Sequence, residues 1–507
     1  MDRRRTGDDR TASRVALAAS VASFVFVALV ASAPGSPFTP MLPSEPGGPF
    51  RWVAELVGLD TLHGNGLAAV GVVAVSFAAI AFLLVLRECR RGTISPRPAI
   101  GLAVAFHVAV LFLPLLFSRD VYSYAYYGKI ATTYHANPYV STPADYPNDV
   151  LASFVGPKWV DTPAVYGALW TQVSALVTRA ADDVGAIVST FRVIAIAASL
   201  ATVFVVGGLV RRVRPERAAF AVALVGLNPV VLFQSAASGH NDLLVALAIA
   251  AALALAFSGR ELWATAALAL GTLVKVTAAV PLLLLWVAVA ARRPRGERVR
   301  AVAPHVVLAA ALALVAAAPF ANTADPTLGV VELGSHEGWL APSRFFRRLF
   351  DALSGDVLGF VPRIAFAVVA AIAVVLVARS LWRRGPEIGP ALVGASWGWG
   401  LLCLMLLGPV LLPWYVTWAL PLGWLLPRVP RAVLIGTGLA LTVSQWTSEP
   451  AAFGSAYNAN LLFGHYVVTP VVIALLGWLL LDLWRRVRSG ASLEDEPTEV
   501  SATARER

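Results

Sequence analysis

Charged residues and cysteines are both scarce in this sequence of 507 residues. Only 14% of the residues are charged, 58% are hydrophobic, and the mean hydropathy is +0.71. These values exclude an ordinary soluble protein. The two cysteines, Cys89 and Cys403, are too far apart in sequence and setting to support a disulfide framework or a thiolate metal site. Apolar runs of helix-spanning length recur as far as Trp484, which predicts an all-α polytopic membrane protein.

Lysine is rare as well, and most of the basic residues are arginines grouped between the apolar runs. The net charge of +10 could suggest a nucleic-acid partner, but the grouping favours a topological explanation. Under the positive-inside rule these groups are cytoplasmic and both termini lie inside. The groups lie at residues 3–14, 87–97, 211–217, 292–300, 383–384, 428–431 and 485–488. The lysines Lys129, Lys158 and Lys275 fall outside them, so each is a candidate functional charge.

Run length and charge parity predict about fourteen membrane crossings. We expect a cytoplasmic tail over residues 1–14, a transmembrane domain over residues 15–484 and a disordered cytoplasmic tail over residues 485–507. Two outer loops, residues 118–183 and 321–362, are too polar to span and too long for simple turns, so they should carry amphipathic helices.

The second outer loop contains one such pattern. Arg344, Arg347 and Arg348 lie at helical spacing beside Phe345 and Phe346. This arrangement is typical of an amphipathic helix on the outer leaflet, near a lipid phosphate.

The first outer loop begins with residues 118–143, SRDVYSYAYYGKIATTYHANPYVSTP. A carboxylate at the end of a span is costly to desolvate, so Asp120 beside Arg119 is a functional-site candidate. The tyrosines that follow, with Lys129, His135 and Asn137, suit a sugar, because aromatic faces pack on its C–H surface and polar groups bind its hydroxyls. The alternative is an interfacial aromatic belt with a solvated Arg–Asp pair.

Three further motifs fall on the same outer side. Residues 157–172 repeat the aromatic and charged character in Lys158, Trp159, Asp161, Tyr166 and Trp170, and are expected to form one or two short amphipathic helices. Residues 228–242 end in His240, Asn241 and Asp242, for which the simpler explanation is an N-cap of the next span. Residues 413–426, which begin with Pro413, Trp414 and Tyr415, are expected to cross back from an outer corner.

Lys275 lies in the middle of an apolar segment, residues 262–291, flanked on both sides by inside arginines. The segment must therefore go out and return as two short helices of roughly 21 Å each, which leaves the Lys275 turn below the outer surface of a roughly 30 Å hydrocarbon layer. A lysine at that depth is costly unless it faces water or an anion. One long tilted helix with a snorkelling lysine is the alternative.

A soluble donor site is missing: the cytoplasmic connections contain no Gly-rich phosphate loop. An enzyme acting outside would then draw an activated donor from the bilayer. The motifs SRDVYSYAYYGKI with NPY, WVDTPAVYGALW, NPVVLFQSAASGHND and PWYVTWALPL, in order over residues 98–426, resemble those of actinobacterial polyprenol-phosphate-mannose-dependent α-1,6-mannosyltransferases of the GT-C superfamily.

The resemblance implies transfer of mannose from a polyprenyl-phosphate donor to a mannan or lipoglycan acceptor at the outer face of the cell membrane, with Asp120 as catalytic base. Inversion at the anomeric carbon needs a single carboxylate, since phosphate leaves without a proton. Lys275, favoured over Lys158, His240 and Arg344, would stabilise the phosphate charge. The residues expected to shape the sugar sites are Tyr122, Tyr124, Asn137, Tyr139, Asp161, Tyr166, Asn241, Asp242, Trp414 and Tyr415.

No Asp-x-Asp pair that would hold a divalent cation is evident on the outer face, so we expect no cofactor and leave a cation open. The alternatives are a related transferase of another sugar, such as arabinose or glucose, and a polyprenyl-lipid transporter or flippase. A transporter would place ionisable residues at mid-span in pseudo-symmetric halves, whereas the polar groups here sit at outer ends.

Overall fold

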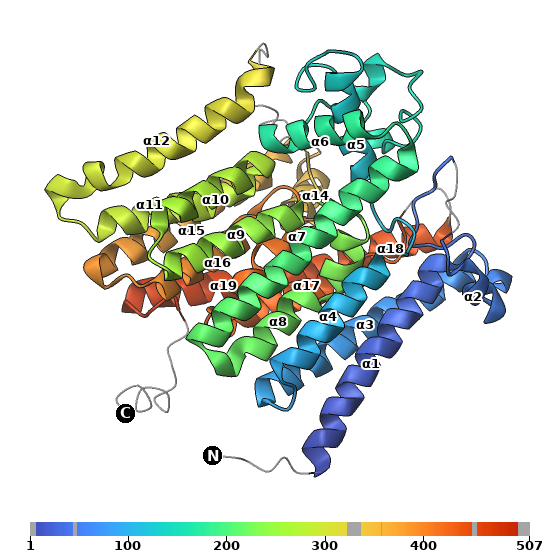
Figure 1. Cartoon of the computed structure of the whole chain (residues 1–507), viewed down its shortest axis with the longest axis horizontal. Coiled ribbons are helices and arrows are strands. Elements are labelled where there is room, and N and C mark those ends of the chain that lie inside the picture. Colours follow the sequence, from blue (N-terminus) through green and yellow to red (C-terminus); the bar gives the residue numbers. More distant parts are fainter. Residues whose placement is uncertain (1–6, 44–47, 322–335, 356, 449–453, 495–507) are drawn as a thin grey trace.

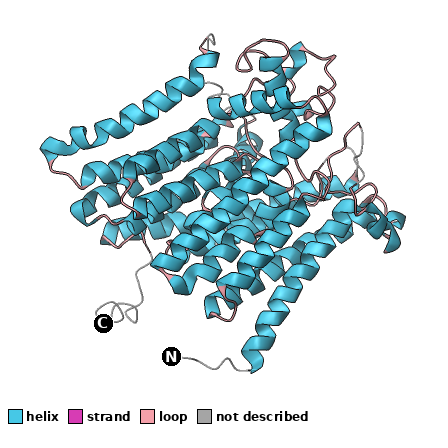
Figure 2. Ribbon diagram, in the orientation of Figure 1, coloured by secondary structure: helices cyan, strands magenta, loops and turns pink. Residues whose placement is uncertain are grey.

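A computed structural model of the chain describes residues 7–43, 48–321, 336–355, 357–448 and 454–494, and within these ranges all regular structure is helical (Figure 2). In this part of the chain, eight helical segments are long and apolar enough to cross a membrane. They comprise α1 (Gly7–Ser32), α3 (Asn65–Arg91), α7 (Val184–Val213), α8 (Ala218–Gly226) with the π-helical η5 (Val230–Ala236), α12 (Arg298–Ala317), α15 (Phe360–Arg384), α16 (Pro390–Leu407), and α18 (Ser455–Phe463) continuing through η12 (Gly464–Val468) into α19 (Thr469–Ser489). The predicted all-α polytopic fold is confirmed, and the number of crossings stays a prediction.

Shorter apolar helices lie among the long ones. They are α4 (Pro96–Val110), α9 (Asp242–Phe257), α10 (Glu261–Val274) and α11 (Ala279–Ala291) with its leading turn η6 (Val276–Ala278). The helices run side by side from α1 at one margin to α12 at the other (Figure 1), and α17 (Arg428–Ser444) packs against α3 and α19.

The predicted interruption at Lys275 is present. Lys275 has an extended backbone (φ −153°, ψ 129°), which ends α10 after 14 residues, and α11 then has 13. Each helix is therefore roughly 20 Å long, well short of a roughly 30 Å hydrocarbon layer. The single long helix with a snorkelling lysine is excluded by this backbone conformation.

Residues 413–426 differ from the regular span that we expected. They fold as two short 3₁₀ turns, η10 (Pro413–Trp418) and η11 (Leu420–Leu422), in which every side chain is buried. Pro413 and Pro421 lack an amide hydrogen, so both disfavour a continuous α-helix here. The segment still crosses the bundle, because the carbonyl of Trp424 accepts a hydrogen bond from Arg217 at the basic end, 2.9 Å away. Irregular backbone at membrane depth is tolerated where protein encloses it.

The arginine groups that separate the spans gather at one end of the bundle. Arg292 donates to the carbonyl of Ile388 (3.0 Å), and Arg384 donates to the carbonyl of Gly490 (2.9 Å). The tail expected to be disordered from residue 485 is ordered as far as residue 494, because α19 runs to Ser489 and Leu493 is buried with its carbonyl bonded to Trp399. Residues 495–507 lie outside the described ranges.

The opposite end carries the elements of the two outer loops (Figure 1). In the first loop α5 (Asp120–Thr132) packs on α6 (Ala168–Ala180), with 3₁₀ turns at η2 (Pro143–Asp145) and η3 (Pro157–Trp159) between them. In the second, α14 (Pro342–Ser354) is the helix that the Arg and Phe spacing predicted, whereas residues 322–335 lie outside the described ranges. A short helix, α2 (Arg51–Leu56), lies beside α1 at the same end.

Candidate active site

Asp120 is the first residue of α5, and the chain that leads to it is held tightly. Phe117 has a left-handed backbone (φ 57°), which is costly for a residue with a side chain. Its backbone amide donates to the carbonyl of Phe38 (2.7 Å), and its carbonyl accepts from the side-chain amide of Gln445 (3.2 Å). The surrounding structure thus imposes a turn that aims α5, and with it Asp120, into the bundle.

A buried arginine braces the same connection from α7. The guanidinium of Arg192 donates to the carbonyls of Val110 (2.7 Å) and Leu113 (2.8 Å), which lie at the C-terminal end of α4. Carbonyls at a helix end have no partner inside the helix, so an arginine satisfies them and their partial negative charge. The Ser238 hydroxyl donates to the carbonyl of Leu116, further along the same connection.

The Asp120 carboxylate faces the loop before α9. Its Oδ2 lies 3.5 Å from Nδ1 of His240, and the Tyr124 hydroxyl lies 3.5 Å from the same nitrogen. The side chain remains 24% exposed, so a ligand can reach it. Burial of the surrounding site raises the pKa of Asp120 to about 6, against the lowering effects of Lys275 and Ser118. The carboxylate is therefore mostly ionised at neutral pH, yet more basic than an ordinary aspartate.

His240 is fully buried and held by its neighbours. Its ring stacks on Trp414, with centroids 3.9 Å apart and an angle of 19° between planes. Burial, helped by the positive charge of Lys275, holds the pKa of His240 well below its usual range. The imidazole is thus neutral here, and its place at the donor phosphate stays a prediction.

Lys275 and Asp242 form a buried ion pair beside this ring. The ammonium lies 2.8 Å from Oδ1 of Asp242, which also accepts from the indole of Trp418 at 2.7 Å. The ammonium lies 4.5 Å from the ring centroid of Tyr415, so a cation–π contact adds to the pair. Asp242 begins α9, Lys275 follows α10, and Tyr415 and Trp418 belong to η10. The fold brings these three segments together.

Buried polar atoms on three successive residues lack a hydrogen-bond partner within the described residues. They are Nε2 of His240, both side-chain amide atoms of Asn241, and Oδ2 of Asp242. Polar groups buried in native proteins are almost always hydrogen-bonded, and an unsatisfied one costs about 1–3 kcal/mol. Their concentration here indicates that this segment binds a polar ligand or solvent.

Aromatic rings enclose the other side of Asp120. Tyr124 makes edge contacts with Tyr166 (4.8 Å between centroids) and Trp170 (5.1 Å). Burial is the main cause that raises the pKa of Tyr166, and the negative charge of Asp120 is the next. The Tyr166 ring therefore lies near that carboxylate. Tyr124 and Trp170 are almost fully buried, so these rings pack against one another and fix the position of α5 beside the carboxylate.

The structure brings together Asp120, Tyr124, Tyr166, His240, Asn241, Asp242, Lys275, Trp414 and Tyr415 of the predicted residues. Trp418 joins them as a donor to Asp242 and was missed; its place in the quoted motif PWYVTWALPL was the available signal.

The remaining predicted residues lie elsewhere. Tyr122 packs against Phe154, and the Tyr139 hydroxyl donates to the carbonyl of Tyr166, so both support the loop. Asn137 bonds the carbonyl of Phe320 at the edge of another cavity.

Lys158 and Asp161 are exposed, and no hydrogen bond or ion pair joins either to the site in the described part of the chain. Arg344 lines a separate cavity on α14.

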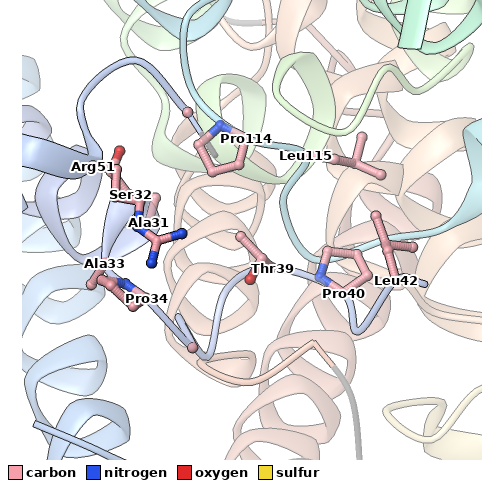
Figure 3. A pocket seen from close by; sticks show the side chains of 12 residues that line it. Ala31, Ser32, Ala33, Pro34, Thr39, Pro40, Leu42, Arg51, Pro114 and Leu115 are labelled. Atoms are coloured by element: carbon pink, nitrogen blue, oxygen red, sulfur yellow. The ribbon is translucent and has the colours of Figure 1, made fainter. Parts of the chain in front are cut away.

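Two other observations bear on ligands. Among the described residues, no three His, Cys, Asp or Glu side chains gather closely enough to hold a metal ion. A small pocket of about 40 Å³ lies between the end of α1 and Pro114, where Ser32, Pro34 and Thr39 line it (Figure 3). It has room for only one or two waters and shares no residue with the site.

Comparisons with known proteins show the family of the chain. The sequence profile of the family described as alpha-(1->6)-mannopyranosyltransferase, N-terminal domain, matches residues 21–292, just over half of the chain. The profile of glycosyltransferase family 87 matches residues 184–409.

Alpha-(1->6)-mannopyranosyltransferase A of Mycobacterium tuberculosis is 28% identical over 341 residues. The match spans 65% of this chain and 65% of that relative, slightly less than two thirds of its length. No solved structure matches significantly. The chain therefore belongs to the alpha-(1->6)-mannopyranosyltransferase family.

Proposed function

We propose that the protein is a mannosyltransferase that moves mannose from a polyprenyl-phosphate donor to a mannan or lipoglycan acceptor, forming an α-1,6 linkage with inversion at the outer face of the cell membrane. The observation that carries this proposal is the cluster at one end of the bundle. There a reachable carboxylate, a buried lysine and unpaired polar atoms meet, remote from the arginine-rich end. By the positive-inside rule that end faces outward.

The chemistry requires one base and one stabiliser of negative charge. Asp120 accepts the proton of the acceptor 6-hydroxyl as its oxygen attacks the anomeric carbon. The bond from that carbon to the phosphate oxygen breaks, and its electron pair leaves with the phosphate. A β-linked donor thereby gives an α-linked product in one displacement through an oxocarbenium-like transition state.

Lys275 supplies the stabilising charge. An ammonium has three N–H donors, and the bond to Asp242 uses one. Asp242 and Trp418 hold the ammonium in place, so little reorganisation accompanies phosphate departure. Neutral His240 acts as a hydrogen-bonding group that orients Asp120 and the sugar.

The first experiment is a membrane assay with labelled polyprenyl-phosphate mannose that compares wild type with Asp120→Asn. Loss of a general base lowers turnover by about 10²–10⁴-fold, and the variant should remain folded and inserted. Asp182→Asn, an exposed carboxylate of the same loop, is the matched control and should keep wild-type turnover. Equal turnover of Asp120→Asn and wild type would remove Asp120 as base.

The same assay separates the related functions. Polyprenyl-phosphate arabinose and glucose serve as alternative donors, and transfer from either in preference to mannose would replace the proposed donor. Donor movement across the membrane without transfer would favour a flippase.

A further inference from the structure

A second charged site lies on the outer-loop helix α14, away from the Asp120 cluster. An open cavity of about 680 Å³ is bounded by α14 and the start of α15. Its lining residues are Glu337, Arg344, Arg347, Asp351, Gly359, Phe360 and Arg363. The three arginines exceed the two acids by one positive charge.

The acids are engaged mainly by one arginine. Arg347 pairs with Glu337 at 2.6 Å and lies 4.0 Å from Asp351. Arg344 and Arg347 each have a buried Nε without a hydrogen-bond partner within the described residues, and Arg347 is the one of the two that pairs with the acids. Burial, and then Arg348 and Arg347, lower the pKa of Arg344, against the smaller effect of Glu337. Arg344 therefore sits in a positive field that an anion would relieve.

The backbone adds to this field. Gly359 is the N-cap of α15, and Phe360 and Arg363 belong to its first turn. Of the first amides of α15, that of Val361 donates to the carbonyl of Leu358 (3.0 Å) and Pro362 has no N–H, so the helix start adds only a small partial positive charge. The arginine side chains are therefore the main groups that would bind a phosphate here.

The rim of the cavity indicates where that phosphate comes from. Phe360, which lines the cavity, is exposed, and so is Ile364 one turn further along α15. Phe346 packs on Phe366 of α15, which fixes α14 along the side of a membrane-length helix. A charged cavity bordered by exposed apolar side chains fits a headgroup whose acyl chains lie along α15.

We propose that the cavity between α14 and α15 binds the phosphate of an anionic membrane lipid. The amide of Gly338 donates to the carbonyl of Pro409 (2.9 Å), which ties the segment before α14 to the loop that precedes η10. A lipid at this site would therefore hold α14 and that loop at headgroup depth. This site goes beyond the proposed transfer reaction, which uses none of its residues.

The test is native mass spectrometry of the full-length protein released from vesicles of equal phosphatidylglycerol and phosphatidylcholine. Wild type should retain phosphatidylglycerol in preference. Arg344→Gln with Arg363→Gln should reduce this retention by about tenfold, since each charge-assisted bond contributes strongly. Arg300→Gln, an exposed arginine at the opposite end, is the matched control and should bind as wild type does.

The remaining arms identify the source of the phosphate. Inorganic phosphate that fails to displace phosphatidylglycerol supports a lipid, whereas displacement at millimolar concentration would overturn the lipid in favour of free phosphate. Equal retention of both lipids, or retention unchanged in the double variant, would overturn the site. Asp120→Asn should retain phosphatidylglycerol fully, so failure of the catalytic proposal and failure of this one are distinguishable.

Discussion

At the scale of single residues, Asp120 should impose a pH dependence on transfer. Its pKa of about 6 is raised above the ordinary value of 3.8, and a base works only when deprotonated. Turnover should therefore rise as pH increases through about 6 and level off above 7. A pH–rate profile of kcat/KM in membranes measures this.

The matched control for that profile is Asp120→Glu, whose carboxylate is displaced by one methylene. Its residual activity should also rise with pH, at a different midpoint. A wild-type rate that is flat between pH 5 and 8 would contradict the assignment.

The Lys275–Asp242 pair gives a second prediction. Asp242→Asn or Lys275→Met alone leaves one buried charge uncompensated, which costs about 3–5 kcal/mol. The double variant removes both charges and should recover most of the lost thermal stability. It should nevertheless remain inactive, because the phosphate then has no cation. Unfolding temperatures in detergent test the expected stability, and transfer assays test the expected loss of activity. A double variant as unstable as the singles would contradict the pairing.

The candidate site could be predicted in part from residue chemistry. His240, Asp242 and Lys275 stood out because polar groups at the ends of apolar runs are costly, and the structure unites them. Lys158 and Asp161 showed the same local pattern but lie exposed, since composition does not reveal which face of a loop turns inward. The role of Trp418 depends on a hydrogen bond across 176 positions, which local sequence does not contain.

At the scale of elements, the junction of α6 and α10 fixes the position of Lys275. The amide of Gly167, the N-cap of α6, donates to the carbonyl of Val274 (3.1 Å), directly before Lys275. A Cβ at position 167 would overlap the Leu273 carbonyl, which is backbone and cannot move aside freely.

Gly167→Ala should therefore separate the two helices and lower transfer by about tenfold or more, since misplacement by about 1 Å can cost 10²-fold. Gly101→Ala in α4 is its control, because nothing lies within 4 Å of the added carbon. That variant should be as active as wild type and slightly more stable. Transfer rates of both variants and wild type are compared at equal abundance in the membrane. A wild-type rate for Gly167→Ala would show that the junction tolerates movement.

The elements themselves were predictable to different degrees. The two short helices around Lys275 followed from segment length and charge parity, both of which are visible in sequence. The 3₁₀ turns of residues 413–426 did not follow, because hydropathy reports burial and leaves the backbone conformation open. At a 3₁₀ rise of about 2 Å per residue, such a segment spans roughly the same hydrocarbon thickness as a longer α-helix.

At the scale of the whole molecule, the two ends of the bundle should face opposite sides of the membrane. Both native cysteines are buried, so the wild-type protein should give little background with a membrane-impermeant maleimide. Lys158→Cys, at the end that carries the site, should be labelled in intact cells. Arg300→Cys, at the arginine-rich end, should be labelled only after permeabilisation. The reverse pattern would overturn the orientation.

The enclosed path of residues 413–426 has a consequence for biosynthesis. This segment does not satisfy all of its backbone N–H and C=O groups by itself. Its release from the translocation machinery into lipid would therefore be costly. Most of the neighbours that surround it, α8, α9 and α16 among them, precede it in the chain and are already present when it emerges, whereas α17, which also packs on it, follows. Ribosome-bound intermediates truncated soon after residue 426 should therefore show this stretch protected by protein before α17 is made.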